Sequence, residues 1–408
     1  MHRLSYSVML AVVTTTTLAA QGRTLIVGPG GYSDFPAALA AAVDGDTIRL
    51  RDGKWTGGTI TKAIRVVGDP SARFETKDQF PAIDIVGIPA GKTVTFEGVS
   101  AAITFLVEYQ PRGDFLRVRD CDGNVHLDGL IATYGNVRFG TCRPLQISNC
   151  KNVSISDCVM QGGVNSIASS IVSIQDSRLT GAFGYYDSDP RSGLFRYSSS
   201  AMNVASSVVV VATSEVVGGS ASPTLWPGFG AQPAIELSNS LMKLAGSKLR
   251  VAAGQDINLR TGSDGIVGVG QLLVDPRATI VGSTGSYVGY RQSMLAAFFR
   301  WPSLRVRGDT PGGTITGEVE GMATGDLVEL YASLPGSPVT LPVDRLGTLW
   351  LDLPTLIVLG RGATLPTMPL SIPIPQDATL AGLPLTFQAL VLSGTTLRFS
   401  TPATVVLD

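Results

Sequence analysis

Short segments in which apolar and polar residues alternate recur along the first three quarters of the chain. One copy is Val153-Ser-Ile-Ser-Asp-Cys-Val, in which every second side chain is apolar until a small or polar residue interrupts the pattern. A period of two is typical of a β-strand that buries one face. The equivalent apolar positions of successive copies are Leu127, Ile155, Ile174, Val211, Leu244 and Val274.

The spacing of these copies distinguishes two architectures. Successive equivalent positions are separated by 28, 19, 37, 33 and 30 residues. The hairpins of an antiparallel sandwich would need a turn about every 8–12 residues, without a motif that recurs at longer spacing. Variable spacing around a constant motif indicates coils whose strands stack while their loops differ in length. The pattern therefore predicts an all-β protein built as a parallel β-helix.

A helical pattern precedes the coils. Residues 33–43 are predicted to form a short helix, in which Ser33 or Asp34 accepts hydrogen bonds from the first turn. Pro36 suits that turn, and Gly45 ends the helix. The apolar face of this helix consists of Phe35, Ala38, Leu39 and Ala42.

The sequence VGPGGYSDFPAALAAAVDGDTIRLRDGKW, followed by ITKAIRVVGD, resembles the N-terminal segment of pectin-lyase-like right-handed parallel β-helix proteins. In that family a short amphipathic helix covers the open end of the coil. An uncovered end would expose core side chains and unpaired strand edges. The resemblance implies a right-handed coil with an N-terminal capping helix, and we place this whole β-helix domain at residues 21–300. The resemblance implies no single activity.

The composition and the strand pattern of the sequence change after Trp301. Residues 301–408 consist of short strands rich in Leu, Pro, Thr and Gly, with prolines near the strand ends. Such segments predict a small C-terminal β-sandwich. The run SIPIPQDATLAGLPLTFQALVL resembles a C-terminal module of uncharacterised exported bacterial proteins and implies no mechanism.

The first segment and the charge balance indicate where the protein acts. Residues 1–20 combine a short basic start, an apolar stretch and small residues at the end, which is typical of a secretory signal peptide. No other stretch has the roughly 18 apolar residues of a membrane span. The formal net charge of -1 argues against a nucleic-acid partner. We expect a secreted or cell-surface protein with no membrane span in the mature chain.

The four cysteines lie within one segment of the predicted coil. In an exported protein an even, clustered count favours disulfides, and the spacing lacks the C-x-x-C pattern of a metal site. Cys121 and Cys150 are about one coil apart, which would leave Cys142 to pair with Cys158. The pairing stays open, and the alternative is a stack of free, buried thiols.

Several acidic residues and one histidine are candidates for catalysis. Enzymes of the resembled family act mostly on polysaccharides, and a glycosidase needs two carboxylates across the scissile bond. Alternation places His126 and Asp128 on one face of their strand, with Val125 and Leu127 on the other. Asp157 and Asp176 occupy equivalent positions in the repeat, which favours a ladder of turns. The candidate catalytic residues are Asp120, Asp122, His126 and Asp128.

The sequence contains no complete signature of the pectinolytic hydrolases, so we expect a protein without catalytic activity. Asp120, Asp122 and Asn124 resemble the start of a calcium loop, but Val125 and Ile131 replace its glycine and its bidentate glutamate. We therefore expect no metal site and no cofactor, with calcium as the alternative.

Two long loops carry aromatic and planar polar groups that suit sugar rings. The alternative is that their aromatic side chains pack over the coil and shield its core. The candidate ligand-binding residues in these loops are Tyr185, Tyr186, Asp187, Asp189, Arg191, Tyr197 and Trp226.

These patterns favour a secreted or cell-surface protein that serves as a non-catalytic recognition or structural module and binds an extracellular polysaccharide or cell-surface components. One alternative is a polysaccharide lyase or glycoside hydrolase. Another is a component of a surface layer, with the C-terminal domain as the attachment module.

Overall fold

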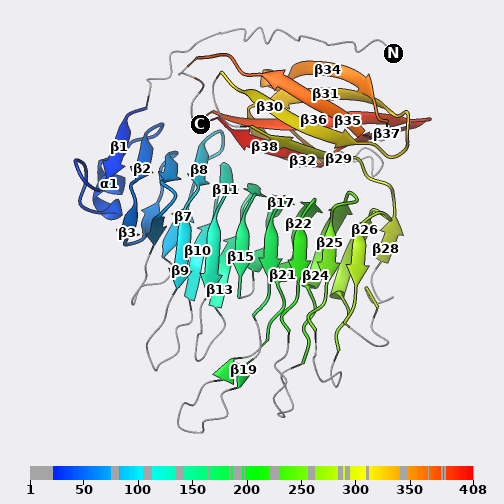
Figure 1. Ribbon diagram of the computed structural model, residues 1–408, viewed down its shortest axis with the longest axis horizontal. Helices are drawn as coiled ribbons and strands as arrows, with labels where there is room; N and C mark the ends of the chain where they lie inside the picture. The colour runs from blue at the N-terminus through cyan, green and yellow to red at the C-terminus, as the bar shows by residue number, and fades with distance from the viewer. Residues whose placement is uncertain are drawn as a thin grey trace. The chain divides into compact units, whose positions relative to one another are not determined.

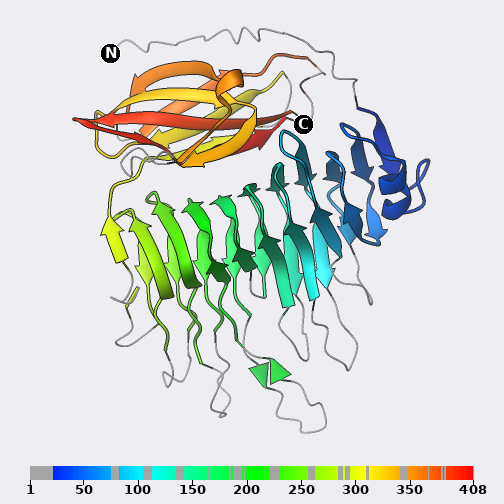
Figure 2. The ribbon, with the colours of Figure 1, turned by 180° about the vertical axis from the view of Figure 1, so that it is seen from behind.

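The computed structural model divides into two compact units, one from Arg23 to Phe299 and one that begins at Arg300. Figures 1 and 2 show the strands of the two units from opposite sides. The expected signal peptide lies outside the described residues. The structure describes residues 22–74, 82–103, 113–134, 142–162, 165–182, 185–186, 195–196, 198–220, 230–255, 262–283, 288–289, 295–308, 312–340, 348–365, 367–377, 380 and 383–407.

The first unit is a right-handed parallel β-helix whose strands stack in three ladders, as predicted (Figure 1). The first ladder contains β1 (Thr24–Val27), β2 (Thr47–Leu50), β5 (Arg65–Gly68), β8 (Thr93–Glu97), β11 (Asn124–Asp128), β14 (Asn152–Ser156), β17 (Ile171–Gln175), β22 (Val208–Ala212) and β28 (Leu295–Phe298). The second contains β4 (Gly58–Ile60), β7 (Ile83–Val86), β10 (Gly113–Arg119), β13 (Cys142–Ser148), β16 (Asn165–Ala168) and β21 (Met202–Ala205). The third contains β3 (Gly53–Trp55), β6 (Ala72–Phe74), β9 (Ser100–Ile103), β12 (Ile131–Tyr134), β15 (Val159–Gln161), β18 (Arg178–Thr180), β23 (Glu215–Val217), β25 (Arg250–Ala252) and β27 (Thr279–Val281).

Two longer strands connect the first and second ladders. β24 (Ile235–Ala245) and β26 (Ile266–Val274) begin in the second ladder and end in the first. Their register shifts between Ser238 and Ser240, where the chain turns the corner. The bulge lets one continuous strand contribute to two faces of the coil.

The register of the first ladder confirms the repeat expected from the sequence. Leu127 pairs with Ile155, and Ile155 pairs with Ile174 on the next coil. The remaining predicted positions continue this column in the same order. All of them are buried in the core of the coil. A shift of one residue would turn every apolar side chain outward, so the burial of this column fixes the register of the strands.

Helix α1 (Phe35–Ala41) covers the first coil, as expected. Asp34 is its N-cap and accepts a hydrogen bond of 2.8 Å from the backbone nitrogen of Ala37. The helix is shorter than the predicted 33–43 and ends at Ala41, with Ala42 already extended. The Phe35 ring meets the Phe74 ring edge-on, with 5.2 Å between the ring centres. This contact joins the cap to the core.

Two corners of the coil repeat a left-handed backbone conformation. Between the second and first ladders, successive coils place Gly87, Asp120, Asn149, Ser169, Ser206 and Asn239 at positive φ. Between the first and third ladders, the corresponding residues are Gly98, Gly129, Asp157, Asp176, Thr213 and Gly246. Glycine, Asn and Asp adopt this conformation most readily. The predicted turn ladder containing Asp157 and Asp176 is therefore confirmed.

Three of the four cysteines, Cys121, Cys150 and Cys158, directly follow these corner residues, whereas Cys142 begins β13. Cys121, Cys150 and Cys158 are buried and free, and the side chain of Cys142 lies outside the described residues. The thiols of Cys121 and Cys150 donate hydrogen bonds of 3.2 Å to the carbonyls of Arg119 and Ser148. The neighbouring Cys121 on the adjacent coil and burial raise the pKa of the Cys150 thiol. Burial raises the pKa of the Cys158 thiol. The three described thiols thus form none of the predicted disulfides in this structure, and a bridge between Cys121 and Cys150 stays a prediction.

The second unit is an antiparallel β-sandwich, as predicted. One sheet contains β29 (Ser303–Arg307), β30 (Thr314–Glu320) and β35 (Thr367–Pro373). The other contains β34 (Ile357–Ala363), β31 (Leu327–Ser333), β36 (Pro384–Ser393), β37 (Thr396–Phe399) and β38 (Ala403–Val406). Its core includes Leu304, Val319, Leu330 and Phe387, which come from alternate positions of both sheets.

Candidate functional site

The second ladder of the β-helix presents a polar face to solvent. On β10, Leu116 and Val118 are buried in the core, so Arg117 between them lies on the outer face. The strand pairings align it with an outward residue on each following coil, about 4.8 Å further along. This polar row consists of Arg117, Gln146, Ser166, Asn203 and Glu236.

At its N-terminal end the row is held in place by an ion-pair cluster. The Nη2 atoms of Arg117 and Arg119 lie 2.7 and 3.1 Å from Oδ2 of Asp84. Arg119 also lies 3.6 Å from the carboxylate of Asp120. Burial of the Asp84 carboxylate opposes its ionisation, but hydrogen bonds from both arginines outweigh burial and hold its pKa below the usual range. The cluster therefore fixes two guanidinium groups at the surface of the coil.

At the other end the row leads to a hollow of about 560 Å³ at the corner between the second and first ladders. Exposed hydroxyl and amide side chains of Ser206, Asn239 and Gln271 contribute to its wall, together with exposed Val269. A wall that mixes hydrogen-bonding groups with apolar atoms matches the two kinds of surface on a sugar ring. The full lining is Ser206, Ser207, Val208, Asn239, Ser240, Leu241, Val269, Gly270 and Gln271.

Two of the catalytic candidates lie in the turn that leads to β11. Asp120 has positive φ, and its Oδ1 accepts a hydrogen bond of 2.9 Å from Nδ2 of Asn149 on the next coil. Asp122 is exposed and forms an ion pair of 2.7 Å with Lys151. Both carboxylates thus have partners that belong to the stacking of adjacent coils.

The other two candidates lie on β11 itself. His126 and Asp128 lie on one face, and Val125 and Leu127 are buried in the core on the other, as predicted. His126 is buried, and its Nδ1 hydrogen-bonds Oγ of Ser154. Its Nε2 has no hydrogen-bond partner among the described residues. Burial lowers the pKa of His126 to about 4, so the imidazole is neutral at pH 7.

The aromatic loop predicted to bind a ligand includes a short hairpin. β19 (Tyr185–Tyr186) pairs antiparallel with β20 (Phe195–Arg196). Figures 1 and 2 show this hairpin beyond the ends of the coil strands. The chain reaches it from β18 and returns to β21, so it belongs to a connection that enters the second ladder. The other loop candidates lie outside the described residues: Asp187, Asp189, Arg191, Tyr197 and Trp226.

The polar row was not predicted from the sequence. Its signal is present in strand β13, where Gln146 lies between the buried residues Leu145 and Ile147. However, the connections that lead into the second ladder differ in length. The spacing of its strands along the sequence therefore does not reveal their register. The first ladder carries the clear repeat because short corners join it to its neighbours.

Within the described ranges, no cluster of three or more His, Cys, Asp or Glu side chains is arranged to hold a metal ion. In the same part of the chain, no helix has the length and apolar character needed to cross a bilayer.

The strand ladders and the antiparallel sheets define a parallel β-helix protein with a C-terminal β-sandwich. No protein-family model matches the chain. No curated protein matches it either.

Three crystal structures of phage proteins are similar in fold. The enzymatically active domain of tailspike protein 2 from Bacteriophage CBA120 is 11% identical, with a TM-score of 0.33, over 92% of this chain and 73% of that chain. The tailspike protein of Acinetobacter phage vB_ApiP_P1 is 10% identical, with a TM-score of 0.31, over 96% and 80%. The corresponding domain of CBA120 tailspike protein 4 is 10% identical, with a TM-score of 0.31, over 93% and 67%. Similarity at this level carries no functional conclusion.

Proposed function

We propose that this protein is an extracellular recognition module that binds a polysaccharide along the second ladder of its β-helix. The observation that carries the proposal is the polar row, in which planar and hydroxyl groups repeat once per coil from Arg117 to Glu236. A polymer with a repeating unit is matched by a surface with a repeating set of hydrogen-bonding groups. Each contact is weak, and several of them in register provide the affinity.

The expected ligand is a linear glycan with both hydroxyl and carboxylate groups. The guanidinium groups of Arg117 and Arg119, held by Asp84, place positive charge at this end of the row, which suits the carboxylates of a glycan. The amide of Asn203 and the hollow beyond it suit neutral sugar hydroxyls and ring faces. The wall of the hollow contains no charged residue, so neutral residues of the glycan would lie there.

A glycan array followed by calorimetry on the best ligand tests the proposal. Joint substitution Asn203→Ala and Glu236→Gln should weaken binding by about tenfold, which corresponds to one or two lost hydrogen bonds. The matched control is Arg178→Ala with Glu215→Gln, an adjacent-coil pair on the third ladder whose side chains are 3.1 Å apart. Binding that is lost equally in both variants, or in neither, would contradict the proposal.

The alternative function is a polysaccharide lyase or hydrolase. It is supported by the carboxylates of Asp120 and Asp122, which lie in the turn directly after the strand that carries Arg117 and Arg119. Ultraviolet detection of unsaturated product and reducing-end assays on uronate polymers would reveal turnover. Turnover that disappears with Asp122→Asn or Asp128→Asn would replace the binding proposal with the enzymatic one.

A further inference from the structure

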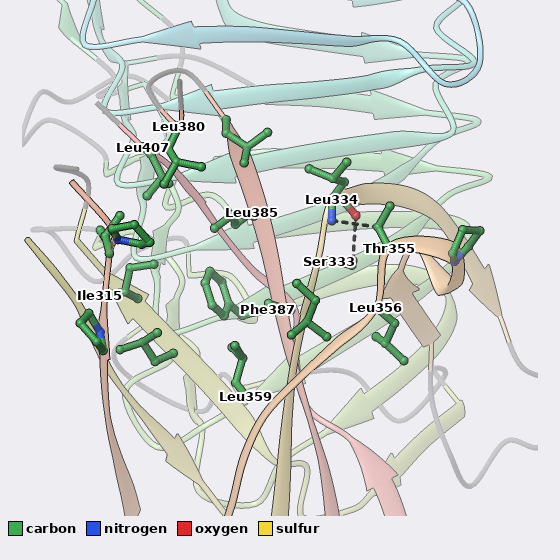
Figure 3. A pocket seen from close by; sticks show the side chains of 18 residues that line it. Ile315, Ser333, Leu334, Thr355, Leu356, Leu359, Leu380, Leu385, Phe387 and Leu407 are labelled. Carbon is green, nitrogen blue, oxygen red and sulfur yellow. Dashed lines mark hydrogen bonds between the residues drawn. The ribbon is translucent and has the colours of Figure 1, made fainter. Parts of the chain in front are cut away.

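The β-sandwich contains a cavity of about 540 Å³ that is separate from the polar row (Figure 3). Both sheets contribute to its wall, with Ile315 and Ile372 from one and Ala332, Leu359 and Phe387 from the other. Ligand pockets typically measure about 300–1,000 Å³, so the cavity can hold a small molecule.

The lining has almost no hydrogen-bonding capacity to offer. Its hydroxyl side chains are those of Ser333 and Thr355, and the lining set includes no charged residue. Ser333 Oγ donates to the Leu334 carbonyl at 2.7 Å and accepts from the Asp352 nitrogen at 2.9 Å. Thr355 Oγ1 accepts from the Leu334 nitrogen at 3.2 Å and donates to an Asp352 carboxylate oxygen at 2.9 Å. A polar group inside the cavity would therefore lose its hydration without replacement.

Burial of the lining changes from one end of the cavity to the other. Leu334 and Ile357 are 38% and 37% exposed, whereas Phe387 is 1% exposed. Figure 3 shows the Phe387 ring between Ile315 and Leu356, with Leu334 further away beside Thr355. The cavity thus leads from an apolar surface into the core of the sandwich.

The geometry points to a binding site for one unbranched alkyl chain of an amphiphile, with its head group in solvent at Leu334 and Ile357. The lining consists mainly of Leu, Ile and Pro, with Phe387 as its one aromatic ring. A hydrocarbon chain is the ligand class that needs no polar partner inside the protein. Compact polar or aromatic ligands would require placed donors and acceptors, or stacking rings.

Calorimetric titration of the full-length protein with straight-chain fatty acids, below their micelle concentrations, tests the assignment. Affinity should rise about fourfold for each added methylene between roughly eight and twelve carbons, and should level off once the cavity is full. Binding should show a negative heat-capacity change, as expected for burial of apolar surface. An alkyl glycoside of equal chain length should bind within severalfold, because no charged residue lines the cavity.

Substitutions at the opening and in the wall of the cavity locate the binding site. Ile357→Asp, at the opening, should lower affinity at least tenfold, because it places a charge beside the chain. Leu365→Asp is the matched control; Leu365 is 74% exposed in the same unit and does not line the cavity. Leu359→Trp should reduce the cavity and shift the plateau to shorter chains. Circular dichroism melting confirms that each variant is folded.

If something other than an alkyl chain covers or fills this cavity, the binding experiments will give different results. Affinity that is independent of chain length, or equal in Ile357→Asp and Leu365→Asp, would overturn the assignment. Sedimentation with phosphatidylcholine vesicles without binding of monomeric amphiphiles would replace it with a membrane-surface contact. Absence of all binding, together with dimers that Ile357→Asp dissociates, would show that a second copy of the chain covers the opening.

Discussion

The ammonium group of Lys62 lies 2.6 Å from the carbonyl oxygen of Ala42, at the C-terminal end of helix α1. The same group donates to the carbonyls of Leu39 at 2.8 Å and Ala40 at 3.2 Å. These carbonyls have no partner within a helix that ends at Ala41, so one positive charge satisfies three acceptors. Lys62 thus fastens the capping helix to the coil beneath it.

Lys62→Met should therefore destabilise the protein by about 1–2 kcal/mol, because charged hydrogen bonds at a helix C-terminus are lost. Urea denaturation measures the change. Lys151→Met is the control, since the side chain of Lys151 forms an exposed ion pair with Asp122 and its loss should cost less than about 0.5 kcal/mol. Equal effects of the two substitutions would contradict this role of Lys62.

The burial of His126 predicts a pH dependence of stability. Its pKa is about 4 in the folded protein and near 6.5 when unfolded, so the unfolded chain binds more protons between these values. Stability should therefore fall as the pH decreases from 7 to 4, with about 3 kcal/mol of the loss due to His126. In His126→Gln that part of the loss should be missing. Parallel pH dependences of the two proteins would show that the imidazole is accessible to water.

The column of buried apolar residues on the first ladder predicts which isoleucine substitutions destabilise the protein. Ile174 is buried between its partners Ile155 and Val211, whereas Ile131 on the third ladder is 47% exposed. Ile174→Ala should cost about 2–5 kcal/mol, because it leaves a cavity between coils. Ile131→Ala should change stability by less than about 0.5 kcal/mol. Chemical denaturation curves of both variants provide the measurement.

Thr213 is a site where stability can be gained. It is a β-branched residue at a φ of 49°, and its Oγ1 accepts a hydrogen bond of 3.3 Å from the Asp176 nitrogen. Thr213→Asn keeps an acceptor and relieves the strained backbone, so the midpoint of thermal unfolding should rise, with a gain of about 0.5–1 kcal/mol. Thr180→Asn, in the extended strand β18, should lower the midpoint instead.

The thiol of Cys158 should be inert in the native protein. It is fully buried, and burial raises its pKa, so it carries no thiolate at neutral pH. A thiol reagent should label Cys158 only after unfolding, as read by peptide mapping. Labelling of Cys158 in the native protein would show that the corner of the coil opens. The same maps, run without reductant, test the bridge predicted between Cys121 and Cys150.

Most of the β-helix was predictable because its determinants are local and repeated. The recurring motif aligns the apolar residues from Leu127 to Val274, and every pairing of that column is found in the structure. Helix α1 was predictable from its cap and its apolar face, although it is shorter than predicted at both ends and runs from Phe35 to Ala41. The turn positions Asp157 and Asp176 follow the same repeat.

The candidate site was less predictable. The sequence indicates candidate polar residues where they cluster along the chain, as in the segment from Asp120 to Asp128. The polar row gathers one residue from each of several coils, and Asn203 and Glu236 have no common motif. The cavity in the sandwich likewise combines residues from Ile315 to Leu407, which no spacing rule connects.

The sequence by itself determined the coil, its capped end and the corners, because alternation, capping and left-handed turns act over a few residues. The tertiary structure alone decided which outward side chains share a face and where the sandwich leaves an apolar cavity. Those features depend on how distant strands come into register, and the loops that set this register vary in length without changing the local pattern.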